Sequence, residues 1–444
     1  MKLIKTFIIN GIILTATSLI LRCIAMFFNS YISRKIGAEA LGLHSLVMSI
    51  YTLAITISLS GINLATTKIV TEEIAIGNIA SIRKIMTKSL LFSIFFSCIG
   101  SILLIIFSPI ICKTWLNNKI SSLPFYIISI SLPFISMSSC LTGYFSAIRN
   151  TIKPASDQVF EHILKVILIS LFLNYFLPCG LEYICIALIL GNIISEIISF
   201  FYIYILYKFD SKVLKRYRST SNSFEKRFLQ ITIPVGLTSF IRSGLSTIKQ
   251  VLIPKGFEKS GNTYEQSLAS YGLITGMAMP LVLFPNVILI SFSNLLIPEY
   301  TEFKAKKQYS RIHKNTKRIL KYTLVFSIVM SIIIFIFAPK LSNYLYKSTN
   351  AIKYIKLLAP LIPIMYIDNV VDAILKGLDK QVSVLKINII DLVSSIFLIL
   401  FLIPKFGVYG YIFIIYFSEI LNFILSYQTL RKSLPWLSIK HAIK

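Results

Sequence analysis

Twelve long apolar stretches occupy most of this chain, and they limit its possible folds more than any other feature. Each stretch holds 20 or more residues, the length that an α-helix needs to cross the hydrocarbon core of a bilayer. The stretches are residues 7–33, 43–66, 88–112, 124–148, 156–177, 183–207, 229–253, 268–298, 319–338, 355–376, 384–403 and 408–430. They lack the period-two alternation of a barrel strand. We therefore predict an all-α polytopic membrane protein with about 12 transmembrane helices.

Composition agrees with this class. Hydrophobic residues make up 55% of the chain, charged residues 14%, and the mean hydropathy is +0.77, which is outside the range of water-soluble domains. Lys2 and Lys5 precede the first stretch, as in a signal peptide. Its apolar part is too long for a signal peptide, so we expect it to be retained as the first span.

Lysine and arginine are distributed unevenly over the connections. If the N-terminus is cytoplasmic, the cytoplasmic segments carry 30 of these residues and the opposite face carries 11. Cytoplasmic loops of membrane proteins are enriched in these residues, so we predict a multi-pass protein of the cytoplasmic (inner) membrane with both termini in the cytoplasm. The net charge of +27 then reflects topology and attraction to anionic lipid. Because the basic residues are split among short loops, we expect no nucleic-acid partner.

The two halves of the chain resemble each other. TSLILRC (17–23) aligns with TSFIRSG (238–244), and SEIISF (195–200) aligns with SEILNF (418–423). The matched positions are Arg22 with Arg242, Pro109 with Pro339, Pro133 with Pro363, Ala147 with Gly377, Glu161 with Asp391, and Glu196 with Glu419. Similar composition alone is the alternative explanation, but the ordered series favours duplication. Each half has an even number of spans, so we predict two six-helix parallel repeats around a central cavity.

This duplication sets the predicted domains. They are an N-terminal six-helix lobe (1–207), a basic cytoplasmic linker (208–228), a C-terminal six-helix lobe (229–430) and a cytoplasmic tail (431–444). The linker is rich in serine and charged residues, so we expect it to be flexible or to form a short surface helix.

Cations inside the apolar stretches predict a binding site. An arginine at the centre of a membrane helix costs about 2.5–3.5 kcal/mol and normally faces a wet cavity or a partner. Arg22 interrupts the first stretch, and Arg242 and Lys249 lie two turns apart on one face of the seventh. We predict that these three cations bind an anionic substrate. The alternative is that each cation pairs with a membrane carboxylate, for example Glu196 or Asp391.

Carboxylates inside the stretches are candidates for ion coupling. Asp368 and Asp372 lie one turn apart, and together with Glu196 they could carry protons or bind a cation. Glu161 and Lys165 are expected to satisfy each other at helical spacing. Nucleotide-binding, metal-binding and catalytic motifs are missing from the sequence, so we predict no catalytic residue, no cofactor and no metal site.

Several motifs resemble the polysaccharide and oligosaccharide flippases of the MATE-like MOP superfamily, the family that includes stage V sporulation protein B and is related to the lipid II flippase. They are RKIGAEALGLH (34–44), SGINLATTK (60–68), GYFSAIRNTIKPA (143–155) and QVFEHILK (158–165). The resemblance implies a flippase for an undecaprenyl-diphosphate-linked sugar, a peptidoglycan precursor or another polysaccharide unit, with a role in spore cortex synthesis.

The resemblance also bears on individual residues. Arg22 matches an arginine that faces the cavity in such relatives, and Asn29 stands where a second basic residue is expected. Asn29 is therefore included in the predicted substrate site, although it makes the cavity less positive near the outer face. Relatives often carry fourteen spans, so a lipid groove formed by two extra helices would be missing here.

The partners implied are a lipid-linked sugar diphosphate, membrane lipids and cell-wall synthesis enzymes. Two other functions stay open at this point. A cation-coupled multidrug exporter of the same fold would use an acid-lined N-terminal cavity, whereas the first span offers Arg22 and no acid. A non-transporting membrane scaffold for cell-wall assembly would not need the arginines at all.

Overall fold

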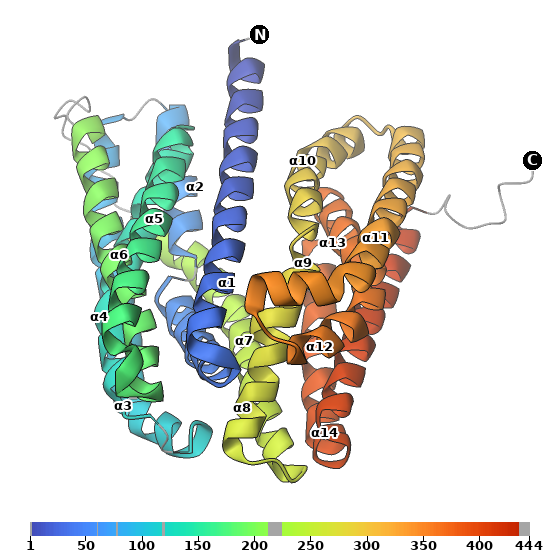
Figure 1. Cartoon of the computed structure of the whole chain (residues 1–444). Coiled ribbons are helices and arrows are strands. Elements are labelled where there is room, and N and C mark those ends of the chain that lie inside the picture. The colour runs from blue at the N-terminus through green and yellow to red at the C-terminus, as the bar shows by residue number, and fades with distance from the viewer. Residues whose placement is uncertain (1, 60, 77–78, 118–119, 212–223, 435–444) are drawn as a thin grey trace, which may run out of the picture. The chain divides into compact units, whose positions relative to one another are not determined.

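The computed structural model describes residues 2–59, 61–76, 79–117, 120–211 and 224–434 (Figure 1). Throughout these residues the chain is helical and contains no β-strand, so the predicted all-α class is confirmed. Contacts divide the chain into two units, one of residues 1–17 and 46–247 and one of residues 18–45 and 248–444.

The first helix, α1 (Lys2–Leu59), differs from the prediction of two spans joined by a loop. It stays helical through the predicted connection and is broken only at Gly37, whose φ is 76°. Glycine adopts such positive φ values without steric cost, so one residue is enough to redirect the helix. After Gly61, with φ 80°, α2 begins at Ile62, and the predicted second span is therefore divided between two helices.

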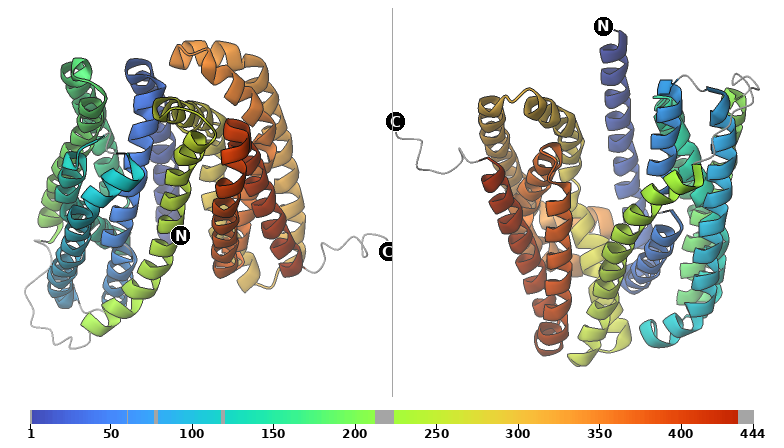
Figure 2. Two further views of the ribbon diagram at one scale, coloured as in Figure 1. Left: turned by 90° about the horizontal axis from the view of Figure 1, so that it is seen from below. Right: turned by 180° about the vertical axis from the view of Figure 1, so that it is seen from behind.

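The first unit is built around α4. This helix packs against α2, α3 and α6, and α5 packs along α6 (Figure 2). Its core holds Tyr144 and Phe145. At Gly143 the missing side chain lets α4 approach α2, since a Cβ there would lie 2.8 Å from the Asn63 carbonyl oxygen. The helices of this unit are α2 (Ile62–Ile76), α3 (Ile79–Trp115), α4 (Leu123–Ala147), α5 (Ile152–Phe176), η1 (Leu177–Cys179), α6 (Leu181–Ser211) and most of α7 (Phe224–Lys259).

The second unit is built in the same way around α13. This helix packs against α10, α11 and α14, with Tyr300 and Ile374 in the core. Within α14 the helix breaks at Gly407, where φ is 55°, and the chain turns sharply (Figure 1). The elements are α8 (Tyr264–Gly272), η2 (Leu273–Ala278), α9 (Met279–Leu283), α10 (Asn286–Ala305), α11 (Tyr309–Tyr346), α12 (Asn350–Leu358), η3 (Ala359–Leu361), α13 (Ile362–Gly377) and α14 (Gln381–Ser433).

Nine helical segments among the described residues are long and apolar enough to cross a membrane. Two of them, residues 16–76 and 381–433, contain 61 and 53 residues. At 1.5 Å per residue, an unbroken helix of either length would be about 80 Å long or more. The hydrocarbon core of a bilayer is only about 30 Å thick, so each segment contains more than one membrane crossing. The predicted seventh span, α7, is outside the nine because Arg242 and Lys249 lower its hydropathy. A multi-pass membrane protein is confirmed, whereas the count of twelve stays a prediction.

Several backbone features recur at a spacing of 230 residues. Arg149 and Asp379 both have positive φ, 58° and 59°, in turns that follow α4 and α13, and Asn117 and Lys347 form a second such pair with 50° and 49°. The turns also repeat their hydrogen bonds, for example from Asn150 N and from Lys380 N to carbonyls five residues earlier. These matches support the predicted duplication. The two-repeat arrangement and the lobe boundaries stay predictions, and residues 212–223 of the linker and 435–444 of the tail lie outside the described residues.

Within the second unit, residues 18–45 of α1 cross α8 closely. A Cβ on Gly272 would lie 1.9 Å from the Ala38 carbonyl oxygen, and a Cβ on Gly42 would lie 2.1 Å from the Leu268 carbonyl oxygen. The two backbones therefore touch at a pair of glycines, which is a common way to pack membrane helices. Directly after this crossing, the predicted eighth span (268–298) changes from α-helix to the π-helix η2.

Candidate functional site

Arg22 lies on α1, and its side chain is exposed. Within the part of the chain that the structure describes, it forms no hydrogen bond and no ion pair. The neighbouring side chains Leu21 and Cys23 are apolar, so the guanidinium is the one group of this helical turn that requires water or an anion. Arg22 is therefore available to a ligand.

Asn29 lies two turns after Arg22 and is half-buried. Its Nδ2 donates a hydrogen bond of 2.8 Å to the carbonyl oxygen of Gly276 in η2. Ser30, the next residue, donates from its Oγ to the carbonyl oxygen of Leu345 at the end of α11, and Arg34 Nε, one turn after Ser30, donates to the same oxygen. These three bonds fix the orientation of α1 in the second unit. The side-chain oxygen of Asn29 is left to accept a further hydrogen bond.

Arg242 lies on α7, is exposed like Arg22, and has no hydrogen-bond or ion-pair partner among the described residues. The helix around it is held by polar contacts of the first unit. Thr56 Oγ1 donates to Ser243 Oγ at 3.2 Å, and Thr247 Oγ1 donates to the Ser49 carbonyl oxygen at 3.1 Å. The sequence match between Arg22 and Arg242 therefore joins two residues in the same condition, an exposed guanidinium on a fixed helix.

Lys249 has a different environment. It is half-buried, its Nζ donates to Ser395 Oγ at 3.1 Å, and it interacts electrostatically with Asp391 and Glu419. Unlike Arg242, Lys249 thus has polar and charged neighbours in its own unit, although it forms no ion pair with a carboxylate of the described residues. Its predicted contact with substrate stays a prediction.

The carboxylates of the second unit are held by hydrogen bonds from α14. Ser418 Oγ donates to Asp391 Oδ1 at 2.6 Å, and Asn422 Nδ2 donates to Asp368 Oδ2 at 3.0 Å. Asp368 is only 6% exposed, and its Oδ1 and the Oδ1 of Asn422 have no hydrogen-bond partner in the described chain. A buried oxygen of this kind is satisfied by protonation of the carboxyl group, by a bound cation or by a buried water molecule.

Asp372 lies one turn after Asp368 and accepts a hydrogen bond of 3.3 Å from Ser426 Oγ. The predicted pair is therefore held by two residues of α14, Asn422 and Ser426. Over the described residues, no group of three or more histidine, cysteine or acidic side chains is arranged to hold a metal ion.

Glu196 belongs to a second network, which lies in the first unit. Tyr51 Oη donates to Glu196 Oε2, and Asn192 Nδ2 donates to its Oε1 at 2.7 Å. Next to it Ser199 Oγ donates to Asp157 at 2.8 Å. Both oxygens of Glu196 are therefore satisfied by the protein, whereas one oxygen of Asp368 is not.

Sequence reasoning missed most partners in these networks. Tyr51 contacts Glu196 from α1, 145 positions away in the sequence, so no local spacing connects the two, whereas Asn192 lies one turn before Glu196 on α6. For the second unit, the sequence did indicate two of the hydrogen-bonding partners. Ser418 and Asn422 both belong to the SEILNF motif that aligns with SEIISF.

Comparison with known proteins places the chain among membrane flippases and transporters. The family profile described as "Polysaccharide biosynthesis protein" matches residues 7–304, and the MatE profile matches residues 260–401. Stage V sporulation protein B of Bacillus subtilis (strain 168) is 27% identical over 443 residues, which cover 98% of this chain and 85% of that protein.

Solved structures give the same fold. A multidrug resistance MATE family transporter of the MOP superfamily in its inward-facing conformation superposes with a TM-score of 0.72 and 12% identity, covering 96% of this chain and 99% of that one. The lipid II flippase MurJ in an inward closed conformation has a TM-score of 0.71 and 14% identity, covering 95% and 89%. The fold is thus the one that these transporters share.

Proposed function

We propose, from the premise that the chain belongs to the polysaccharide biosynthesis protein family, that it translocates an undecaprenyl-diphosphate-linked sugar across the cytoplasmic membrane by alternating access. The sugar would be a peptidoglycan precursor or another polysaccharide unit, and spore cortex synthesis is the proposed setting. The observation that carries the proposal is Arg22, an exposed guanidinium without a protein partner in an apolar helix. Arginine binds phosphate oxygens through two parallel hydrogen bonds, which suits a diphosphate.

The physical task of such a protein is to move charge through hydrocarbon. A diphosphate cannot enter the bilayer unaided, because loss of its hydration costs several kcal/mol or more. In the proposed mechanism Arg22 and Arg242 replace part of that hydration, with Asn29 and Lys249 as further polar contacts. The polyprenyl tail stays in the lipid. A change between two conformations weakens the contacts and releases the substrate on the outer side, and both termini lie in the cytoplasm in this topology.

Asp368, Asp372 and Glu196 are the proposed ion-coupling residues. The strongest support comes from Asp368, which is buried and has one oxygen without a partner. Protonation or cation binding would satisfy that oxygen. Release of the proton or cation would leave the Asp368 carboxylate negatively charged and buried beside Asp372, which costs free energy.

Replacing Asp368 with asparagine should remove this coupling. We expect the gradient-dependent part of the transport rate to fall about tenfold, since a loss of about 1.4 kcal/mol suffices for that change. The measurement is transport into proteoliposomes with and without imposed sodium and proton gradients. Asp379→Asn is the matched control, because Asp379 forms an ion pair with Lys304 at an exposed helix end. Equal gradient dependence in wild type and Asp368→Asn would contradict the assignment.

A multidrug exporter is the second candidate, favoured by the MatE match over residues 260–401. An exporter of cationic drugs needs acidic groups in its cavity, and the second unit supplies them in Asp368 and Asp391. Arg22 and Arg242 would repel such a substrate. A scaffold for cell-wall enzymes is the third candidate, and it would require no transport.

One transport experiment separates the three. Purified protein is placed in liposomes that carry a fluorescent undecaprenyl-diphosphate sugar, and access to a membrane-impermeant quencher is followed over time. We expect access to rise in proteoliposomes and to stay constant in protein-free liposomes. Uptake of a cationic dye without movement of the sugar lipid would identify an exporter. Movement of neither compound by folded protein would favour the scaffold.

A further inference from the structure

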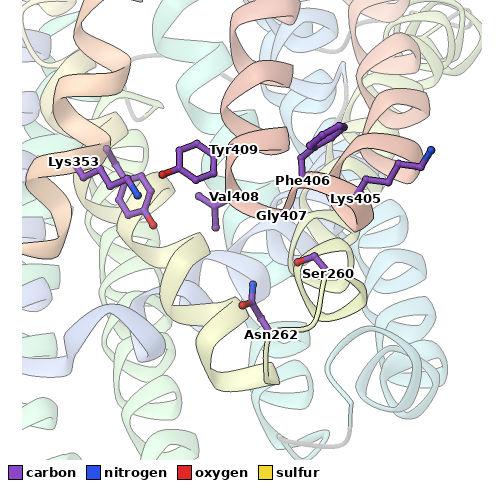
Figure 3. A pocket seen from close by; sticks show the side chains of 9 residues that line it. Ser260, Asn262, Lys353, Lys405, Phe406, Gly407, Val408 and Tyr409 are labelled. Carbon is purple, nitrogen blue, oxygen red and sulfur yellow. The ribbon is translucent and has the colours of Figure 1, made fainter.

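A cavity of about 420 Å³ opens at one end of the second unit (Figure 3). It lies between three segments that are distant in the sequence: the turn from α7 to α8, the start of α12, and the break in α14 around Gly407. Its volume falls in the range of small-molecule pockets, about 300–1,000 Å³. None of the residues proposed above for transport or ion coupling lines this cavity.

Lys353 is the principal charged group in the cavity. Its Nζ lies 4.7 Å from the centre of the Tyr409 ring, and the Tyr409 hydroxyl points toward it in Figure 3. The ammonium group is therefore held by a cation–π contact that leaves its remaining N–H groups free to donate. A second lysine, Lys405, extends away from Ser260 and Asn262.

Polar groups from the α7–α8 turn complete the lining. The side-chain amide of Asn262 is directed toward the cavity in Figure 3 and has no hydrogen-bond partner among the described residues. Ser260 Oγ donates to the Phe257 carbonyl oxygen at 2.7 Å, so its lone pairs are left to accept a hydrogen bond. The cavity thus offers a cation, an amide and a hydroxyl oxygen within one opening.

The lining carries two positive charges and no acidic side chain. Neither Lys353 nor Lys405 forms an ion pair with a carboxylate of the described chain. A pocket with this charge and these donors suits an anion that also presents a hydroxyl or ester oxygen. Lysine binds phosphate groups in this way as a point charge.

The position of the cavity restricts the anion further. It lies where membrane helices end or break, and two of its lining residues, Phe406 and Tyr409, are 64% and 61% exposed. Exposed aromatic side chains and lysines at helix ends are typical of the boundary between hydrocarbon and water. A ligand there can place a charged group in the cavity while its apolar part stays in the bilayer.

We propose that this cavity binds the phosphate of a glycerophosphate group through Lys353 and Asn262, and that the group belongs to an anionic phospholipid. Basic pockets between membrane helices bind anionic head groups in this manner. Soluble glycerophosphate shares the same chemistry and is the other possible source. A neutral sugar fits less well, because the ammonium of Lys353 already lies over the Tyr409 ring on which a sugar would stack.

The test uses the full-length protein, purified with phosphatidylglycerol or with zwitterionic phosphatidylcholine, and counts retained lipid by native mass spectrometry. Lys353→Gln should reduce phosphatidylglycerol retention about tenfold, the effect of losing one charge-assisted hydrogen bond. Asn262→Leu should reduce it by a smaller factor. Lys340→Gln is the matched control, because Lys340 also lies over an aromatic ring, Phe337, but outside the cavity.

Separate arms identify the source of the phosphate. Retention of phosphatidylglycerol that depends on Lys353 and persists in millimolar sn-glycerol 3-phosphate supports the lipid. Displacement of the lipid by sn-glycerol 3-phosphate, again dependent on Lys353, keeps the phosphate site but assigns it to a soluble ligand. Equal loss of lipid from Lys353→Gln and Lys340→Gln would show a diffuse surface attraction and overturn the site. Unchanged retention in both cavity variants would overturn it as well.

Discussion

Replacement of Arg22 by glutamine is expected to lower the initial rate of sugar-lipid translocation by between about tenfold and a hundredfold. A hydrogen bond from a charged donor contributes about 1.5–3 kcal/mol, and each 1.4 kcal/mol of lost transition-state stabilisation corresponds to a factor of about ten. Arg22 has no protein partner to stabilise, so its removal should leave the fold intact. Glutamine should also insert into the membrane more easily than arginine.

Companion variants distinguish phosphate binding from a general charge effect. Arg242→Gln should produce a loss of similar size, and Arg22→Lys should retain part of the activity because it keeps the charge without the paired hydrogen bonds. Lys113→Gln, which removes one positive charge from an exposed helix end, serves as the control and should leave the rate unchanged. Wild-type rates in both arginine variants would refute the proposed binding cavity.

Replacement of Gly272 by alanine is expected to destabilise the protein by about 3 kcal/mol or more. The new Cβ would lie 1.9 Å from the Ala38 carbonyl oxygen and 2.7 Å from the Gly42 nitrogen. Both are backbone atoms of α1, so the overlap can be relieved only if α1 and α8 separate. Overpacking of a well-packed contact typically costs about 1–3 kcal/mol and sometimes more. The measurement is the temperature at which the purified protein loses its monodisperse peak in size-exclusion chromatography.

Gly244→Ala is the matched control for this prediction. Gly244 also lies inside a helix, but nothing comes within 4 Å of the position that its Cβ would take. Alanine is favoured over glycine in a helix by up to about 1 kcal/mol, so the control should be neutral or slightly stabilising. A similar thermal stability for the two variants would show that the α1–α8 contact is looser than the structure describes.

The sequence was sufficient to predict the helices and insufficient to predict their breaks. Long apolar stretches located α3, α4, α5 and α6 to within a few residues at most ends, because hydropathy reports where a helix can be buried in lipid. Hydropathy does not report backbone geometry. The π-helical turn of η2 and the continuation of α1 through Gly37 therefore differ from what the apolar pattern indicated.

In the candidate site, too, the sequence predicts some features and not others. Arg22 and Arg242 are predicted as site residues from their position in apolar helices, since charged residues are rare there and usually face a cavity or a partner. The hydrogen-bonding and charged neighbours of Lys249 could not be predicted from hydropathy. Its neighbours Ser395 and Glu419 come from the two halves of α14, more than 140 residues further along the chain, and only the packing of the second unit brings them to it.

The left-handed turns after α4 and α13 bear on the predicted duplication of the chain. Arg149 and Asp379 have the same backbone conformation and opposite charges, and Asp379 uses its charge to bind Lys304. If the two halves arose by duplication, as the sequence predicts, both copies have kept the place where the chain reverses, whereas the side chain there has changed from a cation to an anion.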